Sequence, residues 1–199
     1  MSETTRVGRP RSTPSSSGAS ARDEILDAAA ALFAERGYAG TSTRSIAERV
    51  GIRQASLYYH FAGKDEILLE LLETSVRPSL DFVEQLRDAP DAAAALFALA
   101  AVDVQTLLDS PHNIGALYLA PEVQEPRFDS FRQDRAQLQQ AYVDLAAAVS
   151  PEGDAAFLGA CCIQLVEMVI PMRREGEPPT GLAESIAAAC LRVVGAPVA

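Results

Sequence analysis

Polar and basic side chains suited to contacts with nucleic acid gather between residues 44 and 64. Gln54 and Ser56 open a short helical stretch that continues into Tyr58 and Tyr59. A Gln side chain can pair with adenine through two hydrogen bonds, and a Ser hydroxyl can donate to several base edges or to a phosphate. Lys64, the only lysine in the chain, begins the next helical stretch, where backbone N–H groups also attract phosphate. These residue types predict contacts with the bases and the backbone of DNA.

Short helices joined by tight turns must position these side chains. The apolar spacing predicts helices at about Arg22–Arg36, Arg44–Val50 and Gln54–Phe61. Hydroxyls at 41–43 can cap the second helix, and Gly51 ends it because glycine tolerates positive φ. Two short helices with a three-residue turn that contains Gly form a helix-turn-helix pattern. The contacts between them are expected from Ile46, Ala47, Val50, Ile52 and Leu57.

The charge of the chain is divided unequally along its length. The net charge is −10, but residues 1–64 hold nine Lys or Arg and six Asp or Glu, which gives +3. Residues 65–199 hold eight and twenty-one, which gives −13. Only the positive end can approach a phosphate backbone at low electrostatic cost, so the acidic remainder fixes the orientation on DNA.

Residues 1–20 are rich in Ser, Thr, Gly and Pro and are expected to form a disordered basic arm. Arg6, Arg9 and Arg11 surround a Gly-Arg-Pro triplet, a composition that can enter an A·T-rich minor groove. A solvated tail with no DNA contact is the alternative interpretation.

The rest of the chain predicts further helices and no strand. A fourth helix starts near residues 63–65 and is expected to bend or break at Pro78. Helical patterns follow at about 91–109, 112–119, 128–149, 153–174 and 180–195. The predicted fold is all-α with about nine helices. It divides into the arm (1–20), a three-helix DNA-binding domain (21–67) and a larger helical domain for effector binding and dimerisation (68–199).

Composition also predicts where the protein is located in the cell and whether it binds a metal or a cofactor. No apolar run is expected to reach the roughly 18 residues that a membrane span needs, and the N-terminus lacks the apolar core of a signal peptide. We therefore expect a cytoplasmic protein with no membrane contact. Cys161, Cys162 and Cys190 lack metal-type spacing and are interpreted as packing residues, so neither a metal nor a cofactor is expected.

Residues 22–70 resemble the TetR family of repressors. The family pattern is an Ala-rich helix closing on Phe-x-x-x-Gly-Tyr, Thr-rich capping with an Ile-Ala pair, Val-Gly-Ile, a Leu-Tyr-Tyr-His-Phe core, and a Lys before acidic and apolar residues. This chain has Phe33-Ala34-Glu35-Arg36-Gly37-Tyr38, Thr41-Ser42-Thr43-Arg44-Ser45-Ile46-Ala47, Val50-Gly51-Ile52, Leu57-Tyr58-Tyr59-His60-Phe61 and Lys64-Asp65-Glu66-Ile67-Leu68. Beyond residue 75 the resemblance extends to helix count and spacing and to Glu125-Pro126-Arg127-Phe128.

The resemblance implies a repressor that binds double-stranded operator DNA as a homodimer and is released by a small-molecule effector. Arg44 falls at a base-reading position of the family, and guanine is the natural partner of an Arg there, with contact to phosphate alone as the alternative. Tyr58, Tyr59, His60 and Lys64 match positions that contact phosphate, although Tyr59 could instead pack against the first helix. The complete predicted interface is Arg44, Arg53, Gln54, Ala55, Ser56, Tyr58, Tyr59, His60 and Lys64, where Arg53 is alternatively a solvated turn residue.

Effector-binding residues are predicted from helical segments that mix aromatic, Met and isolated polar side chains. Core packing or an interface is the alternative for each of them. Glu167 interrupts an apolar helix and needs a partner, for which Arg173, Arg174 or a cationic ligand are the candidates. The predicted set is Phe97, Gln105, His112, Tyr118, Phe131, Tyr142, Gln164, Glu167, Met168 and Met172.

The dimer is predicted to form through the helices near 153–174 and 180–195. Residues 157–172 are apolar nearly all round, and a helix without a polar face has to be covered on every side.

Two other function classes compete with this interpretation. An enzyme is disfavoured because the chain has no Gly-rich phosphate loop, no nucleophile elbow and only two His. A protein-binding module is disfavoured by the basic N-terminal region, since that surface suits phosphate.

Overall fold

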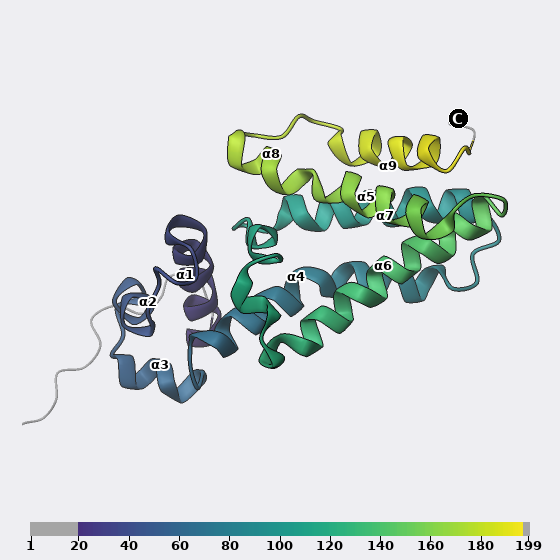
Figure 1. Ribbon diagram of the computed structural model, residues 1–199. Coiled ribbons are helices and arrows are strands. Elements are labelled where there is room, and N and C mark those ends of the chain that lie inside the picture. The colour runs from purple at the N-terminus through teal and green to yellow at the C-terminus, as the bar shows by residue number, and fades with distance from the viewer. Residues whose placement is uncertain (1–19, 197–199) are drawn as a thin grey trace, which may run out of the picture.

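A computed structural model describes residues 20–196 of the chain, so Arg6, Arg9 and Arg11 of the expected arm lie outside the described residues. Within residues 20–196 the chain forms nine α-helices, three short 3-10 helices and no strand. Figure 1 shows a small N-terminal lobe of α1–α3 at one end and a larger body of α5–α9, with α4 running from one into the other. The all-α prediction is confirmed.

The lobe contains α1 (Ala21–Arg36), α2 (Thr43–Val50) and α3 (Gln54–His60). Ser42 caps α2 by accepting from the backbone N–H of Ser45, and Gly51 ends it in the left-handed conformation with φ of +77°. Side chains from all three helices fill the interior between them, among them Ile25, Phe33, Ile46, Ala47 and Leu57. The caps and the buried positions agree with those expected from the sequence.

The long helix α4 (Lys64–Leu86) joins the lobe to the body and contains Pro78 without ending there. Of the two expected outcomes, a bend or a break, the break at this residue is wrong. A proline removes one backbone hydrogen bond from a helix, but Val76, Ser79 and Leu80 around it are buried. Tertiary packing on both sides of Pro78 therefore keeps the helix continuous. The domain boundary predicted at 67/68 falls inside α4.

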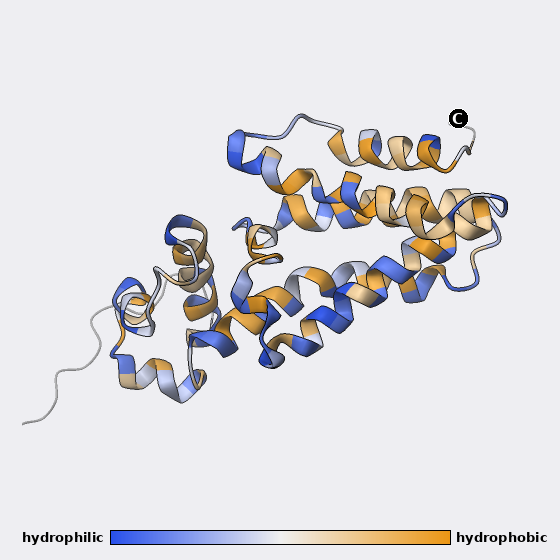
Figure 2. Cartoon of the chain, in the orientation of Figure 1, coloured by the Kyte–Doolittle hydropathy of each residue, from blue (hydrophilic) through white to orange (hydrophobic). Residues whose placement is uncertain are grey.

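The body consists of α5 (Ala92–Asp109), α6 (Asp129–Val149), α7 (Ala155–Glu167), α8 (Val169–Glu175) and α9 (Leu182–Val193). α5 packs against α9, α4 and α6, and α7 packs against α6 and α9. In Figure 2, α5 and α7 are apolar over most of their length, whereas α6 presents many hydrophilic residues. The body is thus a stack of helices in which α5 contacts α4, α6 and α9, while α7 packs on α6 and α9.

The helix expected at 153–174 is divided at Met168 into α7 and α8. Pro171 has no N–H to donate to the carbonyl of Glu167, four residues earlier, so the ladder of hydrogen bonds is interrupted there. The single helix predicted for this segment is therefore a pair.

The α-helix expected at 112–119 is also absent. The segment from 111 to 128 instead contains η1 (Ile114–Leu117), η2 (Pro121–Gln124) and η3 (Pro126–Phe128). A proline is the first residue of η2 and of η3, so a new 3-10 helix begins at each proline. Asn113 donates to the carbonyl of Ile170 over 2.7 Å and ties this 3-10 segment to α8.

Two stretches of the described chain, Ala92–Asp109 and Ala155–Glu175, are long and apolar enough by length and composition to cross a membrane. The expectation that no run reaches this length is wrong. Both stretches pack against other helices of the body, and the core helix of a soluble protein passes the same test. Cys162 and Cys190 are buried where α7 meets α9, and all three cysteines are free.

Candidate nucleic-acid interface and interior site

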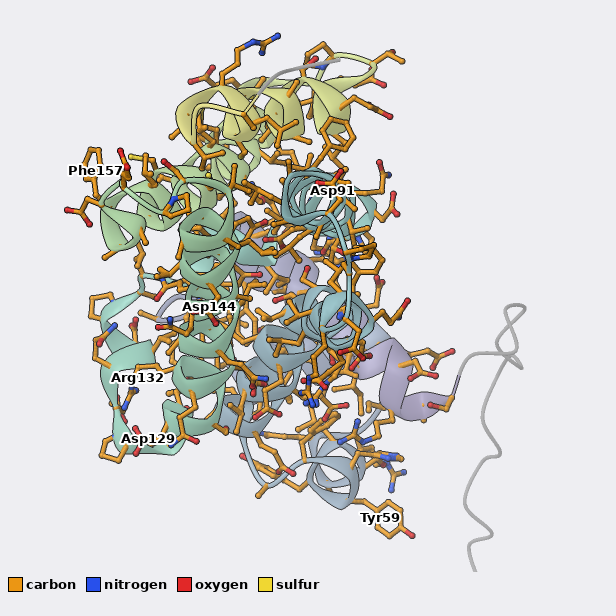
Figure 3. The ribbon with its side chains drawn as sticks, turned by 90° about the vertical axis from the view of Figure 1, so that its right-hand side faces the viewer. Tyr59, Asp91, Asp129, Arg132, Asp144 and Phe157 are labelled. Atoms are coloured by element: carbon orange, nitrogen blue, oxygen red, sulfur yellow. The ribbon has the colours of Figure 1, made fainter. Side chains whose placement is uncertain are left out.

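Helix α3 is held by two buried residues and presents the rest of its surface outward. Leu57 and Phe61 are buried, while the remaining predicted contact residues of α3 are exposed apart from the half-buried His60. Tyr59 is 88% exposed and projects from the end of the molecule in Figure 3. It does not pack against α1, so that alternative is wrong. The edge of its ring meets His60 instead, with 5.3 Å between the centroids.

Thr43, at the start of α2, connects the two helices of the helix-turn-helix. Its hydroxyl accepts from Gln54 Nε2 over 2.9 Å and lies 3.2 Å from the hydroxyl of Tyr58. These bonds orient two predicted contact residues before any DNA binds. From the sequence Thr43 is expected only to cap α2, because a contact across two helices leaves no local signal.

Arg44 and Arg53 are exposed and do not pack into the core of the lobe. The Arg44 side chain is 77% exposed, and its Nε donates to Glu48 Oε1 over 2.9 Å. That hydrogen bond raises the pKa of Arg44 above its ordinary value. Arg53 is exposed immediately before α3 and makes no side-chain capping bond. Both guanidinium groups have the exposure that a base or phosphate contact requires.

Lys64 is engaged within the lobe. Its ammonium donates to the carbonyls of Tyr38 and Thr41 over 3.0 and 3.1 Å and lies 4.1 Å from the centroid of the Tyr38 ring. These contacts attach the start of α4 to the loop between α1 and α2. An ammonium group has three hydrogens, and the two carbonyls occupy two of them. The phosphate contact remains a prediction.

The interior of the body contains two groups of interacting polar side chains that meet at one small cavity. Tyr118 follows η1, and its hydroxyl lies 2.8 Å from Ser75 Oγ while its ring packs on Phe131. Arg135 lies over the Tyr118 ring and forms an ion pair with Glu167. We name this set the buried polar cluster: Ser75, Ser79, Asp103, Tyr118, Arg135, Tyr142 and Glu167.

Asp103 is the most enclosed acid of the buried polar cluster. It accepts from Ser79 Oγ over 2.8 Å and from the Tyr142 hydroxyl over 3.0 Å. Burial raises the pKa of Asp103 to about 6 and that of Tyr118 to about 12. A cavity of about 10 Å³ lies among these residues.

The predicted effector residues divide into two groups. The structure brings Tyr118, Phe131, Tyr142 and Glu167 together at the buried polar cluster. Glu167 has its partner in Arg135 and not in the expected Arg173 or Arg174, because Arg173 donates to the carbonyls of Leu107 and Ser110. The other predicted residues lie outside the cluster, namely Phe97, Gln105, His112, Gln164, Met168 and Met172.

Several open grooves lie on the body. One of about 330 Å³ runs between the η1 region and α7–α8 and includes Tyr118, Gln164, Glu167 and Met168. One of about 560 Å³ lies between α5 and the start of α9 and includes the predicted residue Gln105. A further groove, of about 470 Å³, has an apolar floor of Val83, Leu99 and Leu145 between α4, α5 and α6. It contains none of the predicted residues, since its lining alternates small apolar and surface polar side chains that have no distinctive pattern in sequence.

Two ion pairs and one hydrogen bond connect α1 and the start of α4 to other parts of the chain. Arg22 of α1 pairs with Glu70 of α4 through both carboxylate oxygens. His112 Nε2 lies within hydrogen-bond distance of Asp27 of α1, at 3.0 Å, and Arg127 pairs with Asp65 at the start of α4. The 3-10 segment 111–128 therefore touches α1 near one end and the start of α4 near the other.

Comparison with known proteins gives the same assignment for the lobe. The family model for bacterial regulatory proteins, tetR family, matches residues 25–71. The HTH-type transcriptional repressor KstR2 of Mycobacterium tuberculosis is 47% identical over 76 residues, which are 38% of this chain and 36% of KstR2. The negative transcriptional regulator IcaR of Staphylococcus epidermidis is 40% identical over 67 residues, 34% of this chain and 36% of IcaR. The chain thus spans about a third of the length of these curated relatives.

Solved structures extend the similarity to the body. The crystal structure of Mycobacterium smegmatis AmtR has 43% sequence identity and a TM-score of 0.87, and the match covers 94% of this chain and 92% of that one. The structure of the ketosteroid transcriptional regulator KstR2 of M. tuberculosis has 27% identity and a TM-score of 0.74, covering 88% and 94% of the two chains. KstR2 and IcaR are named as regulators of transcription, which agrees with the expectation that this chain is not an enzyme.

Proposed function

The chain belongs to the tetR family of bacterial regulatory proteins, and from this membership we propose that it is a ligand-responsive transcriptional repressor. In this proposal it binds a palindromic DNA operator as a homodimer in the cytoplasm and is released by a small-molecule inducer. Residues 21–67 bind the DNA, and residues 68–199 bind the effector and the second protomer.

The observation that carries this proposal is the outward surface of α3. Leu57 and Phe61 anchor the helix, while Gln54, Ser56 and Tyr59 remain exposed. A recognition helix in the major groove reads base edges with its first turn and uses phosphate contacts to fix its register. Gln54 and Ser56 occupy that first turn.

The outward faces of α7 and α9 support a homodimer. Phe157 is 65% exposed, and Met168 and Val193 are exposed as well. Phe157 lies at the outer edge of α7 in Figure 3, away from the other helices. On the opposite side of α7, a Cβ at Gly159 would lie 2.7 Å from Val143 Cα, so this helix is pressed closely onto α6. A second protomer on the outward face would cover the exposed apolar side chains.

Release by an effector follows from the geometry that a dimer must satisfy. Two recognition helices meet successive major grooves about 34 Å apart. A ligand that stabilises any other separation weakens DNA binding in proportion to its differential affinity for the two states. The contacts His112–Asp27 and Arg127–Asp65 join the 3-10 segment 111–128 to α1 and α4, and Arg22–Glu70 joins α1 to α4. Through these contacts a change in the body can reach α1 and α4.

The first experiment is selection of random duplex DNA by the purified protein, followed by affinity measurements across salt concentrations. The expected result is one palindromic sequence bound with a steep loss of affinity as salt is added. No enrichment, with weak binding that does not depend on salt, would refute the proposed DNA function. A reporter gene under the selected operator then distinguishes repression from activation.

A further inference from the structure

The Arg135 guanidinium occupies a position of the kind in which proteins bind organic cations. It pairs with the Glu167 carboxylate, and its Cζ lies 4.8 Å from the centroid of the Tyr118 ring. A carboxylate beside an aromatic face attracts amines and guanidines through charge and through the ring quadrupole. The Arg135 side chain is 14% exposed, so the pair is largely removed from water.

The charges of the buried polar cluster do not balance. Asp103 and Glu167 contribute two carboxyl groups, whereas Arg135 contributes one cation. Asp103 accepts hydrogen bonds from the hydroxyls of Ser79 and Tyr142, which are neutral. An uncompensated buried charge is costly. The buried polar cluster therefore favours a cation at the Arg135 position, and an anion there would add to the imbalance.

A route from solvent reaches this position. Tyr118 and Glu167 line both the groove of about 330 Å³ and the cavity of about 10 Å³ beneath it. A cavity of this size holds about one water molecule. A ligand therefore gains room by taking the place of the Arg135 guanidinium, which lines the cavity.

The ring beneath Arg135 belongs to the segment that touches the DNA-binding lobe. Tyr118 lies in the 3-10 segment 111–128 between His112, which contacts Asp27 of α1, and Arg127, which pairs with Asp65 of α4. A change in what covers the Tyr118 ring thus acts on a segment that is attached to α1 near one end and to the start of α4 near the other.

We propose that the buried polar cluster is a binding site for small organic cations of the amine or guanidine class. Such a cation enters through the groove, pairs with Glu167 and Asp103, and displaces the Arg135 guanidinium from the Tyr118 ring. The effect of this exchange on DNA rests on the proposed function, whereas binding of the cation does not.

The first test is chemical rescue. Arg135→Ala empties the position, and methylguanidinium at millimolar concentration is expected to raise the Tm of this variant by a few degrees more than its neutral isostere methylurea. Arg132→Ala is the matched control, because Arg132 lies one turn earlier on α6 and pairs with Asp129 outside the cluster. A selective rise in Arg135→Ala alone supports the site, and equal shifts with the two compounds would overturn it.

The second test uses the unaltered protein and agmatine, which carries an amine and a guanidine. Agmatine is expected to raise the Tm of the wild type, to do so less for Glu167→Gln, and to lower the affinity for the selected operator. If Arg135→Ala does not fold, the wild-type shift decides: no rise in Tm overturns the site. A wild type that binds no operator would refute the proposed function, and the thermal shifts would still decide the cation site separately.

Discussion

The Tyr142 hydroxyl donates to Asp103 Oδ2 over 3.0 Å and joins α6 to α5 inside the helical body. Ser79 Oγ of α4 donates to the other carboxylate oxygen over 2.8 Å. Three helices therefore meet at one acid, and each hydroxyl has its acceptor there. The bonds favour the charged carboxylate, but burial has the larger effect and raises the pKa of Asp103 from 3.8 to about 6.

Replacing Asp103 by Asn is expected to change how stability depends on pH. The folded protein holds the Asp103 proton more tightly than the unfolded chain, so the acid lowers stability as the pH rises from its ordinary pKa of 3.8 through about 6. Between about pH 5 and about pH 7, Asp103→Asn should gain about 1 kcal/mol in unfolding free energy relative to the wild type. Urea denaturation at the two pH values measures this difference.

The control for this experiment is Asp144→Asn, which changes an exposed acid on α6 (Figure 3). Its pH dependence should match that of the wild type. If the two variants behave alike, the raised pKa of Asp103 is refuted.

Replacing Lys64 by Ala is expected to affect both stability and DNA binding. The carbonyls of Tyr38 and Thr41 lose a charged donor, which should lower the unfolding free energy by about 1–2 kcal/mol. If Lys64 also contacts phosphate, all DNA sequences should be bound more weakly and the salt slope should fall by about one. Thermal unfolding and salt titrations of operator binding measure the two effects. An unchanged salt slope would restrict Lys64 to its structural contacts.

The lobe was predictable from sequence because its signals are local. Ser42 and Gly51 lie at the ends of α2, where a capping side chain and a residue with positive φ are required. Leu57 and Phe61 recur at helical spacing and are the buried residues of the α3 region. Short-range rules of this kind apply to a segment whatever the rest of the fold is.

The body was harder to predict because its decisive contacts join distant residues. Pro78 remains inside a helix and Pro171 disturbs one, and only the packing around each proline distinguishes the two cases. Glu167 pairs with Arg135, 32 residues earlier, and not with the basic residues nearest in sequence. The position of Glu167 in an apolar helix indicated that this acid needs a partner. The packing of α6 on α7 determined that the partner is Arg135.

Replacing Arg44 by Ala is expected to weaken binding to the operator by about 1–3 kcal/mol and to relax one base position. The exposed pair that Arg44 makes with Glu48 contributes little to stability, so folding should be nearly unaffected. Binding-site selection with the variant measures the change in base preference. Arg87→Ala is the matched control, because Arg87 pairs with Glu84 at similar exposure near the far end of α4. Equal loss on every sequence would make Arg44 a phosphate contact.

Replacing Phe157 by Asp is expected to separate the proposed dimer. The side chain lies on the outward face of α7, and Gly159 keeps the opposite face pressed onto α6, so α7 cannot turn to move the new charge out of the interface. In a twofold dimer the substitution occurs twice, and each copy should cost about 2–4 kcal/mol of association free energy. Analytical ultracentrifugation across protein concentrations measures the shift to monomer, and the monomer should bind a single half-site weakly.

The control for Phe157→Asp is Ala136→Asp, which adds the same charge at an exposed position of α6. Both variants should keep the helical circular dichroism of the wild type, because both positions are exposed. Only Phe157→Asp should dissociate and lose tight operator binding. A dimer of unchanged affinity in Phe157→Asp would show that the protomers meet through another face, and the exposed apolar side chains of α7 would then need a different partner.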